Sequence, residues 1–153
     1  MEIRKELIKR ILLIDDDHDD CVLFKAALSE VSSTISVDAL NVCEEMLQAL
    51  DNCGPDVIFL DINLPKINGF KCLKQIQSSA KHCRIPIIIY SSSSNPKEVN
   101  IAYEYGAALF FKKPTRYLEL VESLKSILLM DWNTPVVIKQ QYFREGKYHP
   151  FTL

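Results

Sequence analysis

Short apolar runs of strand length recur along the chain and alternate with segments of helical periodicity. The runs cover residues 11–14, 57–60, 85–90 and 109–111, with a weaker alternating run at 35–39. Apolar residues at helical spacing mark the segments 21–30, 43–50, 70–78, 96–105 and 115–130. Side chains share a face every two residues in a strand and about every 3.6 residues in a helix. The pattern therefore predicts a strand followed by a helix, five times over.

The central apolar runs are continuous, which bears on how the strands are arranged. In the run IIIY at residues 87–90, no charged or strongly polar residue alternates with the apolar ones. Strands of this kind are covered on both faces, as in a parallel sheet with helices above and below it. We therefore expect an α/β protein with a doubly wound, five-stranded parallel sheet. Right-handed crossovers place the C-terminal ends of all its strands at one edge, where such proteins have their site.

Polar residues that carry chemistry follow four of the five predicted strands. They are the acids Asp15, Asp16 and Asp17, the acid Asp61, the hydroxyl of Ser91, and the pair Lys112 and Lys113. Several carboxylates gathered at one point repel one another unless a cation holds them together. Carboxylate and carbonyl oxygens suit Mg²⁺, which commonly bridges protein carboxylates and phosphate. The sequence therefore predicts a site that holds a phosphoryl group.

Each of these residues also has a purely structural explanation. Acids just before a helix and in its first turn cap free N–H groups and suit the helix dipole. We assign Asp17, Asp19 and Asp20 to that role. Ser93 or Ser94, together with Asn95, is expected to cap the helix that begins at Pro96, and Asp61 precedes a segment rich in turn residues. These explanations do not account for the joint occurrence of acids, hydroxyl and lysine at one edge.

Composition narrows the classes of function. The 153 residues are the size of one domain, and a formal net charge of -2 lacks the basic excess of a DNA-binding protein. The first residues are too charged for a secretory signal, and no apolar run approaches the roughly 20 residues that span a bilayer. We expect a cytoplasmic protein. Five cysteines without a C-x-x-C pair indicate neither a disulfide framework nor a zinc site, so we expect reduced thiols.

Four blocks of sequence, taken in order, resemble a known family. They are ILLIDDD, FLDINLPKINGF, PIIIYSSSSN and ALFFKKPT. Across roughly residues 8–130, the chain resembles the receiver domain of bacterial two-component response regulators. It is similar above all to stand-alone, chemotaxis-regulator-like receivers. The resemblance implies a flavodoxin-like fold with strand order 2-1-3-4-5 and helices on both faces.

The resemblance also implies roles for individual residues. Asp61 corresponds to the phosphorylated aspartate, and Lys113 to the lysine that balances the phosphoryl charge. The metal ligands would be Asp15, Asp16, Asp61 and the backbone carbonyl of Asn63, with Mg²⁺ as the ion. Side chains alternate along a strand, so only one of the two adjacent lysines can face the site.

Two further positions carry the expected switch. By resemblance, Ser91 is the hydroxyl that responds to phosphorylation, and Phe110 is the aromatic residue that follows its movement. A phosphoryl group adds negative charge and acceptor oxygens, so Ser91 is expected to move inward and Phe110 to rotate from solvent into the vacated space. Core packing is the rival explanation for Phe110, with Phe111 facing the opposite way. The bond between Lys113 and Pro114 is expected to be cis.

These expectations describe a signalling switch rather than an enzyme. We expect a sensor histidine kinase or a histidine phosphotransfer protein to supply the phosphoryl group, and a downstream protein partner to read the result. Neither DNA nor a membrane is expected to bind directly. Two alternatives stay open: an aspartyl-phosphate phosphatase of the haloacid-dehalogenase type, and a receiver that binds its partner without phosphorylation. The first fits poorly, because DDDHD has Asp19 where that family has Thr or Val.

Residues 131–153 lie outside the resemblance. The segment VVIKQQYF is followed by a break around Gly146, so a short hairpin is possible. This extension is too short to form a separate output domain, and we expect the signal to leave through a partner. Its apolar residues are expected either to pack back on the receiver or to form a docking surface.

Overall fold

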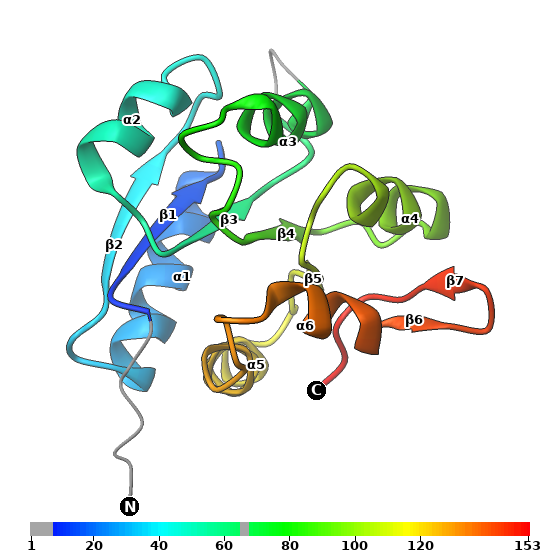
Figure 1. The fold of residues 1–153 in the computed structure, drawn as a ribbon. Coiled ribbons are helices and arrows are strands. Elements are labelled where there is room, and N and C mark those ends of the chain that lie inside the picture. The colour runs from blue at the N-terminus through cyan, green and yellow to red at the C-terminus, as the bar shows by residue number, and fades with distance from the viewer. Residues whose placement is uncertain (1–7, 65–67) are drawn as a thin grey trace, which may run out of the picture.

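A five-stranded parallel sheet forms the centre of the molecule (Figure 1). In the computed structural model, which describes residues 8–64 and 68–153, the strand order is β2-β1-β3-β4-β5. The strands are β1 (Arg10–Ile14), β2 (Ser36–Leu40), β3 (Val57–Leu60), β4 (Ile87–Ser91) and β5 (Leu109–Lys112). The predicted doubly wound sheet and its strand order are confirmed.

Helices follow the strands and cover both faces of the sheet. They are α1 (His18–Val31), α2 (Met46–Cys53), α3 (Gly69–Ser78), α4 (Pro96–Glu104) and α5 (Tyr117–Leu128). Helices α1 and α5 pack together on one face, and α2, α3 and α4 cover the other (Figure 1). Within residues 8–64 and 68–153, no helix has both the length and the apolar character that a membrane crossing requires.

Alternate side chains of the buried strands point into two separate cores. Phe59 of β3 and Tyr90 of β4 belong to the core beneath α1 and α5, where both meet the ring of Phe24 edge-on. Leu60 and Ile89, from the same two strands, belong to the core beneath α2, α3 and α4. Because both faces of the central strands are buried, their sequences read as continuous apolar runs.

Capping side chains fix where α1, α3 and α4 begin. Side-chain oxygens of Asp17, Asn68 and Asn95 accept hydrogen bonds from backbone N–H groups of the first turn, at 2.9 to 3.1 Å. The predicted cap by Asp17 is confirmed, and of the three residues proposed to cap α4 it is Asn95 that does so. These helix ends lie where the strands' C-terminal edge gives way to loops, so the caps orient the loops that carry the polar residues.

The start of α3 lies against the loop that leaves β3. The N–H of Gly69 donates to the carbonyl of Ile62 at 3.0 Å. A Cβ atom at position 69 would collide with the Cα of Ile62 and with the carbonyl oxygen of Asp61. Glycine is therefore required here by the close approach of two backbones. Residues 65–67 of the same loop lie outside the described residues.

Two of the five cysteines are joined, which corrects the sequence prediction. Cys43, in the turn before α2, and Cys72, in α3, form a disulfide with Cα atoms 6.0 Å apart. Both lie in the core beneath α2, α3 and α4. Reduced thiols were the wrong expectation for this pair, because a separation of 29 residues carries no local signal. The packing of α3 beside the start of α2 brings the two residues together.

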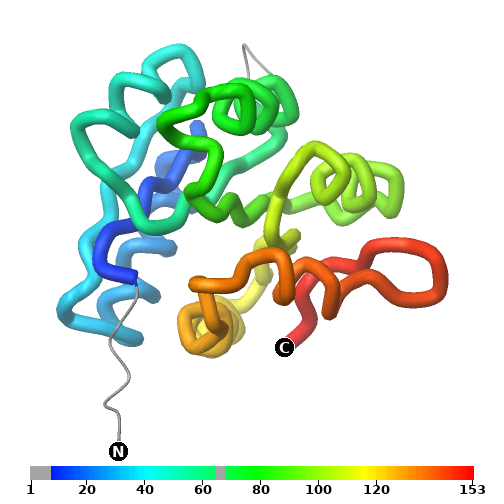
Figure 2. Tube along the Cα trace, in the orientation of Figure 1, coloured from blue at the N-terminus to red at the C-terminus, as the bar shows by residue number. Residues whose placement is uncertain are grey.

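The residues after α5 fold back on the sheet. They form α6 (Pro135–Gln141) and an antiparallel hairpin of β6 (Phe143–Arg144) and β7 (Lys147–Tyr148), which lies beside α4 (Figure 2). Ile138 and Phe151 are buried in the core beneath α1 and α5. The hairpin was among the expectations, whereas α6 was not. The apolar residues of this segment were expected either to pack on the receiver or to form a docking surface. Ile138 and Phe151 pack on the receiver.

The C-terminal residues also close the outer edge of β5. The carbonyl of Phe110 accepts from the Phe151 N–H at 2.7 Å, and the Phe110 N–H donates to the Tyr103 hydroxyl at 3.0 Å. The Tyr103 hydroxyl in turn donates to the carbonyl of His149 at 3.0 Å. The ring of Tyr103 stacks on the ring of Tyr148, with centroids 4.6 Å apart. An edge strand otherwise leaves such backbone groups open to solvent or to another chain. In this chain, residues of the C-terminal extension cover the outer edge of β5 and lie beside α4.

Candidate functional site

The pairing of β1 with β3 brings the buried acids of the site together. Ile14 lies opposite Leu60 at the ends of the two strands, so Asp15 and Asp61 follow side by side. The backbone N–H of Asp61 donates to the carbonyl of Ile14 at 2.9 Å, which extends this register by one residue. Asp15 is 1% exposed and Asp61 is 5% exposed, whereas Asp16 is exposed. Two carboxylates are thus held inside the protein at the C-terminal edge of the sheet.

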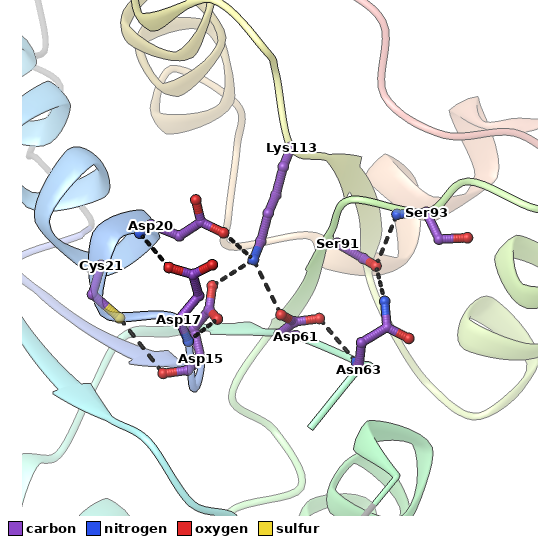
Figure 3. Close-up of polar contacts among 9 residues, drawn as sticks. All are labelled: Asp15, Asp17, Asp20, Cys21, Asp61, Asn63, Ser91, Ser93 and Lys113. Carbon is purple, nitrogen blue, oxygen red and sulfur yellow. Dashed lines mark hydrogen bonds and ion pairs between the residues drawn. The ribbon is translucent and has the colours of Figure 1, made fainter. Parts of the chain in front are cut away.

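One ammonium group lies among these carboxylates (Figure 3). Nζ of Lys113 is 2.7 Å from Oδ2 of Asp15, 2.8 Å from Oδ2 of Asp20 and 3.1 Å from Oδ2 of Asp61. The backbone N–H of Lys113 donates to the carbonyl of Ser91 at 2.7 Å, so the lysine continues β5 alongside β4. The preceding lysine is exposed, as the alternation of side chains along a strand requires.

Hydrogen bonds link Asp61 to the hydroxyl that ends β4. Oδ1 of Asp61 accepts from the backbone N–H of Asn63 at 2.9 Å. The side-chain amide of Asn63 donates to Oγ of Ser91 at 3.2 Å, and Oγ also accepts from the Ser93 N–H at 3.2 Å. Ser91 is fully buried. The candidate phosphoacceptor and the candidate switch hydroxyl are therefore connected through Asn63 (Figure 3).

The acids offer a donor set that fits a hard divalent cation. One carboxylate oxygen from each of Asp15, Asp16 and Asp61 lies within 4.8 Å of the other two. Oδ2 of Asp15 is buried and touches the ammonium of Lys113, but it has no hydrogen bond of ordinary geometry. An oxygen in that condition can still bind a cation, and an all-oxygen set suits Mg²⁺. These three acids would hold the ion, and the part of the Asn63 carbonyl stays a prediction.

Burial and neighbouring charge shift the pKa values of two groups in opposite ways. Burial raises the pKa of Asp15 to about 6 from an ordinary value of 3.8, and the charge of Asp61 adds to this rise, whereas Lys113 opposes it. Burial alone would lower the pKa of Lys113. Close contacts with the carboxylates of Asp15 and Asp20 and the charge of Asp61 outweigh that effect, so the pKa of the lysine is raised. Lys113 is thus protonated at neutral pH.

The raised pKa of Asp15 predicts a pH dependence of the metal-free protein. Between pH values of about 4 and 6, folded protein binds more protons at this residue than unfolded chain, so its contribution favours folding at low pH. That contribution, about 3 kcal/mol at most, is lost as the pH rises through 6. Urea unfolding with a chelator from pH 4 to 7 measures it. Asp15→Asn cannot titrate and supplies the reference, and parallel curves for the two proteins would contradict the prediction.

Asp20 belongs to the site, which corrects its assignment to the helix dipole alone. Its carboxylate contacts Lys113, and its side chain is one-third exposed. Its neighbour Asp19 is exposed and fits the original assignment. The direction of side chains in a helix is the signal that could have found Asp20. Because they tilt toward the N-terminus, an acid in the first turn can reach the loop edge of the sheet.

Phe110 does not lie where the switch prediction places it. Its side chain is fully buried, in the core beneath α2, α3 and α4, and does not face solvent. Phe111 faces the other core, where its ring packs near Phe151. The physical reason is that Phe110 points to the helix-covered face of β5, while the C-terminal extension covers the strand's edge. Rotation of Phe110 from solvent is therefore the wrong starting point for a switch in this chain.

A second family-based expectation also fails. The described residues contain no cis peptide bond, so the bond between Lys113 and Pro114 is trans. The trans isomer is the more stable form even before proline. Lys113 reaches the carboxylates with this bond in the trans form.

Comparisons with known proteins point to one family. The model of the response regulator receiver domain matches residues 11–125. Sensory transduction protein BceR from Halalkalibacterium halodurans is 32% identical over 119 residues, which make up 78% of this chain and 49% of BceR. Response regulator protein GraR from Staphylococcus epidermidis is 29% identical over 120 residues, or 77% of this chain and 50% of GraR. The chain thus spans about half the length of these relatives.

Solved structures agree in fold. The crystal structure of the phosphorylated cyanobacterial phytochrome response regulator RcpA matches with a TM-score of 0.71 at 28% identity, covering 78% of this chain and 91% of RcpA. The Mn²⁺-bound form of response regulator Rcp1 matches with a TM-score of 0.68 at 27% identity, with the same two coverages.

The chain is thus an α/β domain with a doubly wound parallel sheet and with buried acids and a lysine at the C-terminal edge of that sheet. This chain belongs to the response regulator receiver domain family, which acts in two-component signalling.

Proposed function

We propose that this chain is a phosphorylation-dependent switch in a two-component phosphorelay, with Asp61 as the phosphoacceptor and Mg²⁺ as its ion. The position of Asp61 carries the proposal. Its buried carboxylate lies 3.1 Å from Nζ of Lys113 and shares a cluster of oxygens with Asp15 and Asp16. Phosphoryl transfer requires negative charge to be balanced around the phosphorus, and this position has an ammonium and a cation site beside it. The phosphorylated state of RcpA and the Mn²⁺ bound to Rcp1 support the proposal by similarity.

In the proposed transfer, a carboxylate oxygen of Asp61 attacks the phosphorus of a phosphohistidine on the donor protein. The O–P bond forms as the P–N bond breaks, and the imidazole nitrogen keeps the electron pair. Lys113 stays protonated and balances charge on the phosphoryl oxygens. Mg²⁺ held by Asp15, Asp16 and Asp61 would neutralise further charge on those oxygens. Hydrolysis of the acyl phosphate by water releases inorganic phosphate and returns the Asp61 carboxylate, which resets the switch.

Ser91 is placed to report the modification. Its Oγ accepts hydrogen bonds from Asn63 and Ser93, and neither bond uses the hydroxyl proton. A phosphoryl group on Asp61 would offer that proton a strong, charged acceptor. We propose that Ser91 turns toward the phosphoryl group. Because Phe110 is already buried, the change would reach the surface through the β5 backbone and the C-terminal residues bonded to it.

The partners follow from this scheme. We propose a sensor histidine kinase or a histidine phosphotransfer protein as the donor, and a downstream protein as the reader of the signal. Residues 8–130 would form the receiver unit and residues 131–153 its extension. The hairpin and the final residues lie on the α4–β5 side, so a partner that reads this side would contact the extension. Capture of proteins by beryllofluoride-loaded and untreated protein would identify that partner.

The phosphoacceptor assignment has a direct test. Incubation with acetyl phosphate and Mg²⁺ should add one phosphate to the wild type, as measured by intact-mass spectrometry. Asp61→Asn should remain unmodified, because an amide is not a comparable nucleophile toward phosphorus. Asp19→Asn is the matched control, since Asp19 is an exposed acid in the first turn of α1, and it should be modified like the wild type. Phosphate on Asp61→Asn would refute the assignment.

Two further measurements separate the alternative functions. Turnover of many equivalents of a small phosphomonoester would favour a haloacid-dehalogenase-like phosphatase. A receiver that acts without phosphorylation would bind its partner equally well before and after loading with beryllofluoride, which mimics the acyl phosphate.

A further inference from the structure

The ammonium of Lys113 is already held by carboxylates in this structure, through hydrogen bonds to Asp20 and Asp61 and an ion pair with Asp15. A protonated lysine carries three N–H donors. Three carboxylates, those of Asp15, Asp20 and Asp61, lie within 2.7 to 3.1 Å of its Nζ. A phosphoryl oxygen that approaches Lys113 must therefore compete with these carboxylates for its ammonium.

Asp20 differs from the other two acids in its relation to the cation site. Its oxygens are not in the Asp15, Asp16 and Asp61 cluster that could hold a metal ion. Its backbone is fixed independently, since its N–H donates to the capping carboxylate of Asp17 at 3.1 Å at the start of α1 (Figure 3). Asp20 therefore reaches Lys113 from helix α1, whereas Asp61 reaches it from the loop after β3.

Solvent access decides which contact is easiest to lose. The side chain of Asp15 is completely buried, so Asp15 has no water to replace a lost ammonium. The side chain of Asp20 is 33% exposed and can be hydrated when Lys113 leaves. Asp61 is itself the residue that would carry the phosphoryl group. Of the three, Asp20 is the partner that the lysine can exchange at the lowest cost.

We infer that Asp20 is a positioning residue that holds Lys113 in the unphosphorylated protein and gives it up to a phosphoryl oxygen when Asp61 is modified. The inference deepens the proposed function and rests on it. Asp20 then acts through Lys113 and not on the phosphoryl group itself. By competing for the ammonium, it biases the site toward the unphosphorylated state.

The test compares two single-charge variants of the same helix turn. Asp20→Asn removes the competing charge, whereas Asp19→Asn removes an exposed charge one residue away that has no ion pair with Lys113 in the described part of the chain. Beryllofluoride is titrated at saturating Mg²⁺, with backbone amide signals of Ser91 and Asn63 as the readout. Asp20→Asn should bind beryllofluoride about 2- to 5-fold more tightly than Asp19→Asn, as expected for a partly exposed ion pair. Equal or weaker binding by Asp20→Asn would overturn the inference.

A second measurement examines the contact without metal or phosphate analogue. In chelator, the effect of Asp20→Asn on the urea midpoint should disappear when Lys113 is also replaced by methionine, while the effect of Asp19→Asn should not change. Loss of this coupling would overturn the positioning contact alone. Failure of the wild type to bind beryllofluoride would instead overturn the proposed function, and with it the exchange. The two failures are therefore distinguishable.

Discussion

Gly69→Ala is expected to destabilise the protein by about 3 kcal/mol, the upper end of the cost of forcing an extra group into a packed site. The new Cβ would meet the backbone of Ile62 and the carbonyl of Asp61, and backbone cannot rotate away as a flexible side chain can. The start of α3 must then move off the loop that leaves β3. Urea unfolding measures the loss of stability. Because that loop carries Asp61 and Asn63, phosphorylation by acetyl phosphate should also slow.

A second glycine provides the control for this substitution. Gly146 has φ +77° at the tip of the hairpin, and a Cβ there would meet no atom within 4 Å. Gly146→Ala should cost about 1 kcal/mol, because alanine is strained in the left-handed region, and it should leave phosphorylation unchanged. Similar effects of the two substitutions on phosphorylation would show that the contact between α3 and the β3 loop does not shape the site.

Lys113→Met is expected to lower the free energy of unfolding of the metal-free protein by about 3 kcal/mol at pH 7. The buried carboxylates of Asp15 and Asp61 would lose their shared cation, and burial would penalise any charge that stays there. Part of the loss should be recovered by Mg²⁺, since the oxygens of the acid cluster remain in place. Urea titrations with chelator and with Mg²⁺ give both quantities.

The adjacent lysine makes a matched comparison. Lys112 is exposed at the end of β5 and has no ion pair with the acids in the described part of the chain, so Lys112→Met should change stability by less than about 0.5 kcal/mol. It should also leave the response to Mg²⁺ unchanged. Equal destabilisation by the two substitutions would mean that loss of a lysine at this edge, and not loss of the buried cation, accounts for the effect.

Much of the fold follows from local pattern. The run at Val57–Leu60 was predicted to the residue, because burial on both faces requires four apolar side chains in succession. The position of Asn95 before a proline likewise marks the start of α4. The edge strand β2 has a weaker pattern, since its residues are exposed or half-buried. Helix α6 carried no clear period of its own, and it is held by the burial of Ile138 in the core.

The acids, hydroxyl and lysine of the candidate site could likewise be proposed from their places after the strands. Asp20 could not be assigned to the site in this way, because its role depends on how far α1 lets it reach toward Lys113. Phe110 could not be placed either. Its side chain lies in the core beneath α2, α3 and α4, and the contact of the extension with the β5 edge joins residues about 40 positions apart in the chain.

The sequence by itself determined the order of strands and helices, the edge at which the site lies, and the kinds of side chain that meet there. Tertiary structure alone decided which acids share the ammonium of Lys113, that Cys43 and Cys72 are joined, and that the last residues cover the edge of β5. The physical reason is the sequence separation over which each kind of interaction acts. Periodicity and turn chemistry act over a few residues, whereas ion pairs, disulfides and edge contacts depend on distances that only the packed chain sets.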